Sequence, residues 1–340
     1  MNSIFNSKPV NIAIDAMGGD YAPDVPIHGI QKFLSNNPDE PVFFTIFGDK
    51  EQIGKKMQKY KIDESYYSIV HCDEYIPSDM KPSMALRKSG GSSMRSAIES
   101  VAKKECDASV SGGNTGALMA LSKIILKTVK TIDRPAICST MPTIKGRVVL
   151  LDMGANIDVT AENLFQFAIM GSAYAKVVLK KKSPKIGLLN IGSEDIKGHA
   201  YIQEAAEMIK NSHLKSNFIG NVEPDQIYEG DVDVVVTDGF TGNVIIKSAE
   251  GLGRLVKSLL STAFTKSLLS LTGYGLAKRS LKKSMKSVDP NNYNGAMFIG
   301  LNGVSVKSHG GADYLGFANA ISNAYIIVKD EMNKKIVDKI

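Results

Sequence analysis

Five turns rich in glycine and small polar residues each follow a short apolar run. The clearest is Ser111-Gly112-Gly113-Asn114-Thr115-Gly116, which lies between apolar residues 108–110 and a segment with helical spacing. Glycines let the backbone approach a ligand closely, and the start of a helix presents free N–H groups with partial positive charge. The turn predicts a site for phosphate or another oxyanion, although capping of the helix by Asn114 or Thr115 explains these residues equally well.

This turn does not indicate a nucleotide, because it is not GxGxxG and lacks the lysine of a Walker A loop. The other four turns are residues 15–20 (DAMGGD), 152–156 (DMGAN), 190–198 (NIGSEDIKG) and 237–243 (TDGFTGN). Open α/β sheets bind ligands at the carboxyl ends of their strands. We therefore expect all five turns to gather at one edge of a sheet.

Two cations and a histidine lie in or near such turns. Lys197 could pair with a phosphate dianion or a developing oxyanion, and His309 could donate a proton or a hydrogen bond near neutral pH. Arg87 lies in residues 78–95, which resemble a mobile loop. Solvated lysine and arginine side chains and a structural histidine are the ordinary alternatives. The histidines have no zinc-like spacing, and the absence of GxSxG argues against an α/β-hydrolase nucleophile.

Composition limits the classes of protein and of partner. Hydrophobic residues make up 43% of the 340, enough for a sizeable core, and the net charge is +6. Residues 251–290 hold eight lysines and arginines against one aspartate, so the rest of the chain is close to neutral. This local basicity disfavours a general nucleic-acid-binding surface. With no predicted signal peptide or membrane span, and three cysteines expected to be reduced, we expect a cytosolic protein.

The elements that must position these turns alternate along the chain. Short, continuously apolar runs are typical of strands buried on both faces, and alternation with helical segments predicts βαβ units in a layered α/β fold. The helix predicted after Gly116 shows an apolar stripe of Leu118, Leu121, Ile125 and Val129. No linker divides the chain, so we expect one domain over residues 1–340.

The segment 251–286 differs from the rest. Residues 251–271 predict a helix with one apolar face that includes Leu252, Leu255, Leu259 and Leu271, and a strongly basic stretch follows. Such a helical hairpin could lie on an anionic membrane, contact another subunit or receive an acidic protein. An ordinary amphipathic core helix is the commonest source of the pattern, and the adjacent positive charge favours the surface roles.

Seven fragments, in order, resemble one family closely: the acyl-carrier-protein-dependent phosphate acyltransferases of bacterial phospholipid synthesis. The fragments are IAIDAMGGDYAP (12–23), ALRKSGGSSM (85–94), SGGNTGALMA (111–120), LDMGANIDV (151–159), LLNIGSEDIKG (188–198), DVVVTDGFTGNVIIKSAEG (233–251) and LNGVSVKSHGGADYLGFANAI (301–321). Residues 87–91 read RKSGG where the family pattern is more basic, and this departure leaves the role of Lys88 open.

The resemblance implies a Rossmann-like α/β/α sandwich with a mostly parallel sheet, related to the isocitrate and isopropylmalate dehydrogenases and to phosphate acetyltransferases. It implies transfer of a fatty acyl group from acyl carrier protein to orthophosphate, with no cofactor and no metal. The acyl phosphate would serve a membrane glycerol-3-phosphate acyltransferase. It also implies a homodimer on the inner face of the membrane, which fits the predicted protruding hairpin.

On this basis the residues divide into three expected roles. Catalysis is assigned to Lys197, His309 and Asn243. Substrate binding is assigned to Asp15, Gly18, Gly19, Arg87, Ser111, Gly112, Gly113, Asn114, Thr115, Asp152, Asn156, Asp238 and Gly239. Contact with the membrane or carrier protein is assigned to Leu252, Leu255, Leu259, Lys278, Arg279, Lys282 and Lys283.

Two other classes of protein remain open from the residues alone. A dehydrogenase on the related fold would need a nicotinamide site and clustered metal-binding aspartates, and no such cluster is evident in the sequence. A membrane scaffold without catalytic activity would need only the 251–286 hairpin, and would leave the five turns unexplained.

Overall fold

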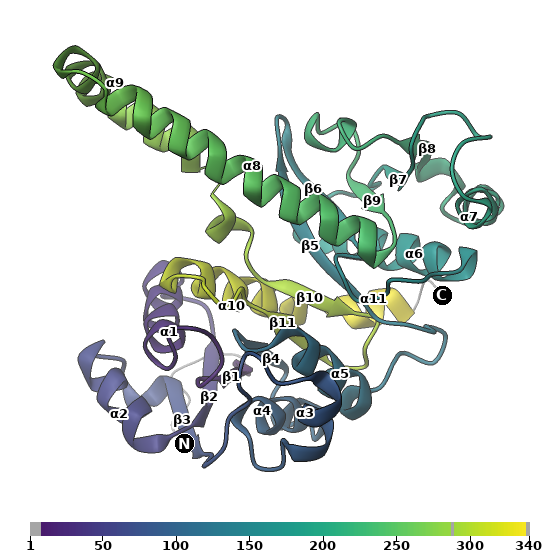
Figure 1. Cartoon of the computed structure of the whole chain (residues 1–340). Helices are drawn as coiled ribbons and strands as arrows, with labels where there is room; N and C mark the ends of the chain where they lie inside the picture. The colour runs from purple at the N-terminus through teal and green to yellow at the C-terminus, as the bar shows by residue number, and fades with distance from the viewer. Residues whose placement is uncertain (1–7, 287–288, 338–340) are drawn as a thin grey trace.

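A computed structural model describes residues 8–286 and 289–337, and it contains one eleven-stranded sheet with helices on both faces (Figure 1). The strands are β1 (Val10–Asp15), β2 (Val42–Gly48), β3 (Tyr67–His71), β4 (Ala108–Ser111), β5 (Ala136–Thr143), β6 (Gly146–Leu151), β7 (Ile186–Leu189), β8 (Phe218–Val222), β9 (Val234–Val236), β10 (Ala296–Ile299) and β11 (Val304–Lys307). The helices are α1 (Asp24–Asn36), α2 (Lys50–Lys59), α3 (Pro82–Lys88), α4 (Ser93–Ala102), α5 (Thr115–Leu126), α6 (Ala161–Val178), α7 (Ala200–Lys210), α8 (Gly239–Thr265), α9 (Leu268–Lys286), α10 (Tyr314–Lys329) and α11 (Met332–Val337).

The layered α/β fold predicted from the sequence is confirmed. Strands β4, β7 and β9 are buried throughout, as expected of strands covered by helices on both faces. One apolar core joins the sheet to α1, α6, α7, α10 and α11. Two further clusters cover the other face, one with α3, α4 and α5 and one with the beginning of α8. The fold is therefore a three-layer α/β/α sandwich.

The sheet is mostly parallel but changes direction near its middle. Its order is β3-β2-β1-β4-β11-β10-β5-β6-β9-β7-β8, and the pairings β11–β10, β10–β5 and β5–β6 are antiparallel. Strands β1, β4 and β11 consequently run one way, while β6, β9 and β7 run the opposite way. The carboxyl ends of these two sets of strands lie at opposite edges of the sheet.

Side-chain caps begin the helices next to the glycine turns. Asn114 accepts a hydrogen bond from the Ala117 amide at the beginning of α5, and Asp238 accepts one from the Thr241 amide at the beginning of α8. Helix α5 ends at Leu126, and Lys127 adopts a positive φ of 57°. Val129, predicted to continue the apolar stripe, instead lies beyond the helix and is buried in a loop.

Helices α8 and α9 form a hairpin that protrudes from the body of the molecule (Figure 1). The prediction of one helix over residues 251–271 was wrong at both ends, because α8 begins at Gly239 and ends at Thr265. Leu271 therefore belongs to α9. Phe264 and Tyr274 contact each other across the hairpin, with ring centroids 5.2 Å apart. Among the described residues, no helix is long and apolar enough to span a membrane.

Candidate functional site

Three neighbouring strands bring the first group of predicted residues together. Strand β4 pairs with β1 and with β11, and the register places Ser111 opposite both Asp15 and Lys307. The chain leaves all three strands at the same edge of the sheet. The loops 15–20, 111–116 and 308–311 therefore lie side by side, and we call them the first loop group.

A buried carboxylate organises this group. Asp15 is 1% exposed and accepts hydrogen bonds from the Ser111 hydroxyl (2.6 Å), the Ser93 hydroxyl (2.7 Å) and the Met17 amide (3.3 Å). Burial raises the pKa of Asp15, because desolvation disfavours the charged form, while the two serine hydroxyls act in the opposite direction. The carboxylate fixes the positions of β4 and of the beginning of α4.

The glycines of these loops are needed for close packing. A Cβ added to Gly18 would lie 2.4 Å from an Asp15 carboxylate oxygen and 2.7 Å from the Gly113 nitrogen. Gly19 has a positive φ of 109°, and the next amide, that of Asp20, donates to the Gly310 carbonyl at 3.0 Å. Larger residues at either glycine would separate the loops.

Lys307 completes the group and was not predicted from the sequence. It is 9% exposed, and its ammonium group donates to the carbonyl oxygens of Gly112 (3.3 Å) and Ser308. Burial lowers its pKa to about 8, against the opposing effect of the Asp15 and Asp20 carboxylates. A signal was present in the sequence, because a lysine that ends the run VSVK directly before a glycine turn is unusual in a buried strand.

Several predicted residues of the first group are already occupied by internal hydrogen bonds. The Gly113 amide donates to the Ser111 hydroxyl at 3.0 Å. Besides capping α5, the Asn114 amide nitrogen donates to the carbonyls of Ser78 (2.8 Å) and Met80 (2.9 Å). Asn114 thus performs the capping role that the sequence left as an alternative. Thr115, the first residue of α5, is exposed.

His309 lies at the surface in the first loop group, and Arg87 lies at the surface on α3, which packs against α5. The His309 side chain is exposed, and its Nδ1 accepts a hydrogen bond from the Gly311 amide at 3.2 Å. Its backbone amide donates to the Asn294 side-chain oxygen (2.8 Å), while the Asn294 amide nitrogen donates to the Ser308 hydroxyl (2.8 Å). Arg87 is exposed in the last turn of α3.

A second loop group lies at the opposite edge of the sheet, after β6 and β9. Asp152 is fully buried and accepts hydrogen bonds from the amides of Ile137, Gly154, Ala155 and Asn156 and from the Asn156 side chain, at 2.7–3.1 Å. Burial raises its pKa while these bonds oppose the shift. A carboxylate with so many internal donors organises its own loop.

The beginning of α8 packs directly on this loop. The Gly239 amide donates to the Asn156 carbonyl at 2.7 Å, and a Cβ added to Gly242 would lie 1.9 Å from the Asp152 carbonyl oxygen. Asp238 is engaged as the helix cap. Asn243 is exposed beside Gly154.

Lys197 lies in a third loop, which follows β7. Its side chain is exposed and packs over Gly192, and its carbonyl accepts a hydrogen bond from the Asn190 side chain at 3.0 Å. Strand β7 runs in the same direction as β6 and β9, so this loop belongs to the edge of the second group.

The expectation that all five turns gather at one edge of the sheet was therefore wrong. His309 belongs to the first group, whereas Lys197 and Asn243 belong to the opposite edge, and β10, β5 and β6 separate β11 from β9. The physical reason is the reversal of strand direction between β11 and β6. The roles assigned to individual residues remain predictions.

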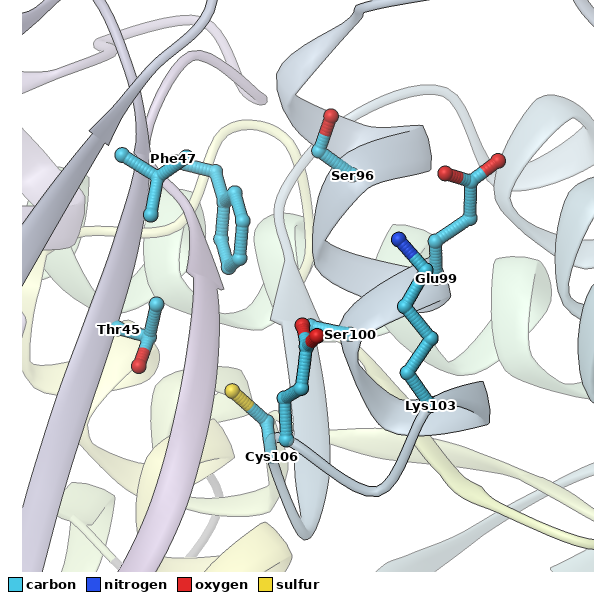
Figure 2. A pocket seen from close by; sticks show the side chains of 9 residues that line it. Thr45, Phe47, Ser96, Glu99, Ser100, Lys103 and Cys106 are labelled. Carbon is cyan, nitrogen blue, oxygen red and sulfur yellow. The ribbon is translucent and has the colours of Figure 1, made fainter.

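A cavity of about 270 Å³ has none of the residues predicted for substrate in its wall (Figure 2). Its wall includes Thr45, Phe47, Glu99, Lys103 and Cys106. Cys72, Cys106 and Cys138 are buried free thiols, as the sequence predicted. In the part of the chain that the structure describes, no three histidine, cysteine, aspartate or glutamate side chains are grouped so that they could hold a metal ion.

Comparison with known proteins relates nearly the whole chain to one family. The model of the family described as "Fatty acid synthesis protein" matches residues 10–335. A "Phosphate acyltransferase" of Rhodospirillum centenum is 47% identical over 329 residues, which are 97% of this chain and 92% of that protein. Another, from Anaplasma phagocytophilum, is 44% identical over 333 residues, covering 97% of this chain and 96% of that one.

Solved structures show the same fold at low sequence identity. A phosphotransacetylase from Streptococcus pyogenes aligns with a TM-score of 0.64 and 18% identity, covering 95% of this chain and 94% of that one. A branched-chain phosphotransacylase from Enterococcus faecalis aligns with a TM-score of 0.58 and 16% identity, covering 94% of this chain and 99% of that one. The relatives at 44–47% identity cover nearly the whole chain, and it therefore belongs to the fatty acid synthesis protein family that includes the phosphate acyltransferases.

Proposed function

We propose that this protein transfers a fatty acyl group from the thioester of acyl carrier protein to orthophosphate. The observation that carries the proposal is 47% identity over 97% of the chain to a curated phosphate acyltransferase. The first loop group supports it, because its glycine-rich turns and buried lysine suit a small anion. The product, an acyl phosphate, would be consumed by a membrane glycerol-3-phosphate acyltransferase.

The reaction needs little from the protein beyond binding and charge. A phosphate oxygen attacks the thioester carbonyl, a C–O bond forms, the C–S bond breaks, and the carrier leaves as a thiolate that takes up a proton. Phosphate is itself a good nucleophile, so we propose direct attack without an acyl-enzyme. The enzyme holds the phosphate against the carbonyl and stabilises the tetrahedral oxyanion.

The site follows from this chemistry. We propose that the loops 15–20 and 111–116 hold phosphate, with His309 beside the acyl carbonyl. The catalytic roles of Lys197 and Asn243 and the substrate contacts of Asp152, Asn156, Asp238 and Gly239 remain proposals for the opposite edge of the sheet. Arg87, exposed in the last turn of α3, is proposed to bind substrate.

The hairpin is proposed as the docking element. Leu252, Leu255 and Leu259 are 61%, 55% and 61% exposed on α8, and Lys278 and Arg279 are exposed on α9. The side chains of Lys282 and Lys283 lie outside the described residues. An apolar face beside basic residues suits the acidic carrier protein or the anionic inner face of the membrane. We further propose that one domain of residues 1–340 acts as a homodimer in the cytoplasm.

Incubation with palmitoyl-carrier protein and radiolabelled phosphate tests the function. The expected product is a labelled, hydroxylamine-sensitive acyl phosphate that forms only when both substrates are present. Direct attack predicts intersecting initial-rate lines, whereas parallel lines and an acylated protein in the absence of phosphate would indicate a covalent intermediate. Formation of free fatty acid alone would contradict the proposed function.

A further inference from the structure

Lys307 is a buried cation whose charge the fold itself does not require. Lysine is almost never fully buried unless it is paired, yet among the described residues Lys307 makes no ion pair within 4.0 Å. Its ammonium group instead donates to two backbone carbonyls. A neutral donor could satisfy these carbonyls without the cost of burying a charge.

The two carbonyls belong to different loops of the first group. Gly112 lies in the loop after β4, and Ser308 lies in the loop after β11. One ammonium group therefore joins the two loops at their bases. The carboxylates of Asp15 and Asp20 are close enough to favour its charged form, but burial outweighs them and lowers its pKa to about 8. At neutral pH the group is mostly protonated.

We propose that Lys307 is the positioning residue of the phosphate site, holding loops 111–116 and 308–311 together and supplying the positive charge that draws a phosphate dianion to them. This inference rests on the proposed function and names the residue on which phosphate binding depends. A bound dianion would in turn favour the charged lysine, so each would stabilise the other.

Substitution of Lys307 by methionine keeps most of the side-chain volume and removes the charge. We expect kcat/KM for phosphate to fall by about 10- to 100-fold, the range expected when a charged group that favours a bound anion is lost. The loss should come mainly through KM for phosphate, with KM for the acyl carrier protein little changed.

Ser305→Ala is the matched control. Ser305 lies two residues earlier on β11, is fully buried, and shares a hydrogen bond of 3.0 Å with Ser122. The variant loses a buried polar contact on the same face of the strand but no charge. We expect it to lower the melting temperature and to leave kcat/KM for phosphate close to that of the wild type. Equal losses of activity in Lys307→Met and Ser305→Ala would show that Lys307 has only a structural role.

The pH profile of the wild type tests the charge even if Lys307→Met fails to fold. We predict that kcat/KM for phosphate falls as pH rises through about 8, where Lys307 of the enzyme without bound phosphate loses its proton. Asp20→Asn removes a carboxylate that favours the charged lysine, so the fall in kcat/KM at alkaline pH should occur at a lower pH in this variant. The groups that face Lys307 in this titration are Asp15 and Asp20.

Each outcome has a distinct meaning. Two results would overturn the role of Lys307 and leave the function intact, provided that the wild type forms acyl phosphate. One is a Lys307→Met variant that is as active as the wild type. The other is a fall in kcat/KM at alkaline pH that Asp20→Asn does not move. A wild type that forms no acyl phosphate would overturn the function itself. Calorimetric titration with inorganic phosphate measures phosphate binding without the acyl substrate. Equal phosphate affinities of the wild type and of Lys307→Met would also overturn the role of Lys307.

Discussion

Individual residues of the first loop group differ in how far the sequence reveals them. Asp15, Gly18 and Ser111 stand out because they follow apolar runs, and the structure joins them around one buried carboxylate. Ser93 and Lys307 were assigned no role from the sequence. Ser93 lies 78 residues from Asp15 in the chain, so only the folded sheet and α4 bring its hydroxyl to the carboxylate.

Ser111→Ala should destabilise the protein in a pH-dependent way. The hydroxyl supports the charged form of Asp15, whose pKa burial has already raised above 3.8. A carboxyl with a raised pKa keeps its proton to higher pH, so losing the hydroxyl should cost less at about pH 4 than at about pH 8, where the charged form is more favoured. At the higher of these pH values we expect a loss of about 1–3 kcal/mol in the free energy of unfolding.

Urea denaturation at the two pH values measures this difference. Ser122→Ala is the control, because its hydrogen bond to Ser305 is equally buried but involves no carboxylate. Its cost should be similar at both pH values. A pH-independent loss in Ser111→Ala would show that Asp15 does not depend on the hydroxyl for its charge.

At the scale of single elements, the sequence located strands β1, β4, β6, β7 and β9 and the beginning of α5, but not the ends of the hairpin. Turn residues such as Asn114 and Asp238 mark helix starts because their side chains cap the free amides. Ser267 caps the beginning of α9 in the same way, because its hydroxyl accepts a hydrogen bond from the Ser270 amide at 3.1 Å, but the apolar pattern runs across this break and concealed it. The first turns of α8 were read as part of a substrate loop because glycines occupy them.

Those glycines allow α8 to begin against the loop of Asp152. Gly242→Ala should destabilise the protein by about 1–3 kcal/mol, because the added Cβ would lie 1.9 Å from the Asp152 carbonyl oxygen. Gly253 lies in the same helix with no atom within 4 Å of an added Cβ, so Gly253→Ala should stabilise by up to about 1 kcal/mol.

Thermal unfolding of the two variants against the wild type measures both effects. The expected result is melting temperatures that move in opposite directions. A neutral Gly242→Ala would mean that α8 does not need its close approach to the loop after β6.

At the scale of the whole molecule, the sequence predicts the layers but not the direction of every strand. The β5–β6 hairpin turns at Ile144 and Lys145, with Gly146 at a positive φ of 144°, and it reverses the chain within two residues. The apolar run 148–151, which precedes the turn 152–156, predicts one more parallel strand, and this prediction puts the turn at the wrong edge. A buried apolar run carries no information on strand direction, which long-range pairing decides.

The hairpin of α8 and α9 is a second feature at this scale. Replacing Leu255 and Leu259 by aspartate removes apolar surface that is already exposed, so the fold should be retained. We expect the variant to lose sedimentation with vesicles that contain phosphatidylglycerol, while the wild type sediments and is released by salt. Undiminished sedimentation of the variant would place membrane contact elsewhere.

The central claim is that phosphate binds at the first loop group, and hydrogen–deuterium exchange with and without inorganic phosphate tests it most directly. We predict slower exchange in residues 15–20, 111–116 and 308–311, and little change in residues 152–156 and 237–243. Protection confined to the second set, or to residues 190–198, would contradict it.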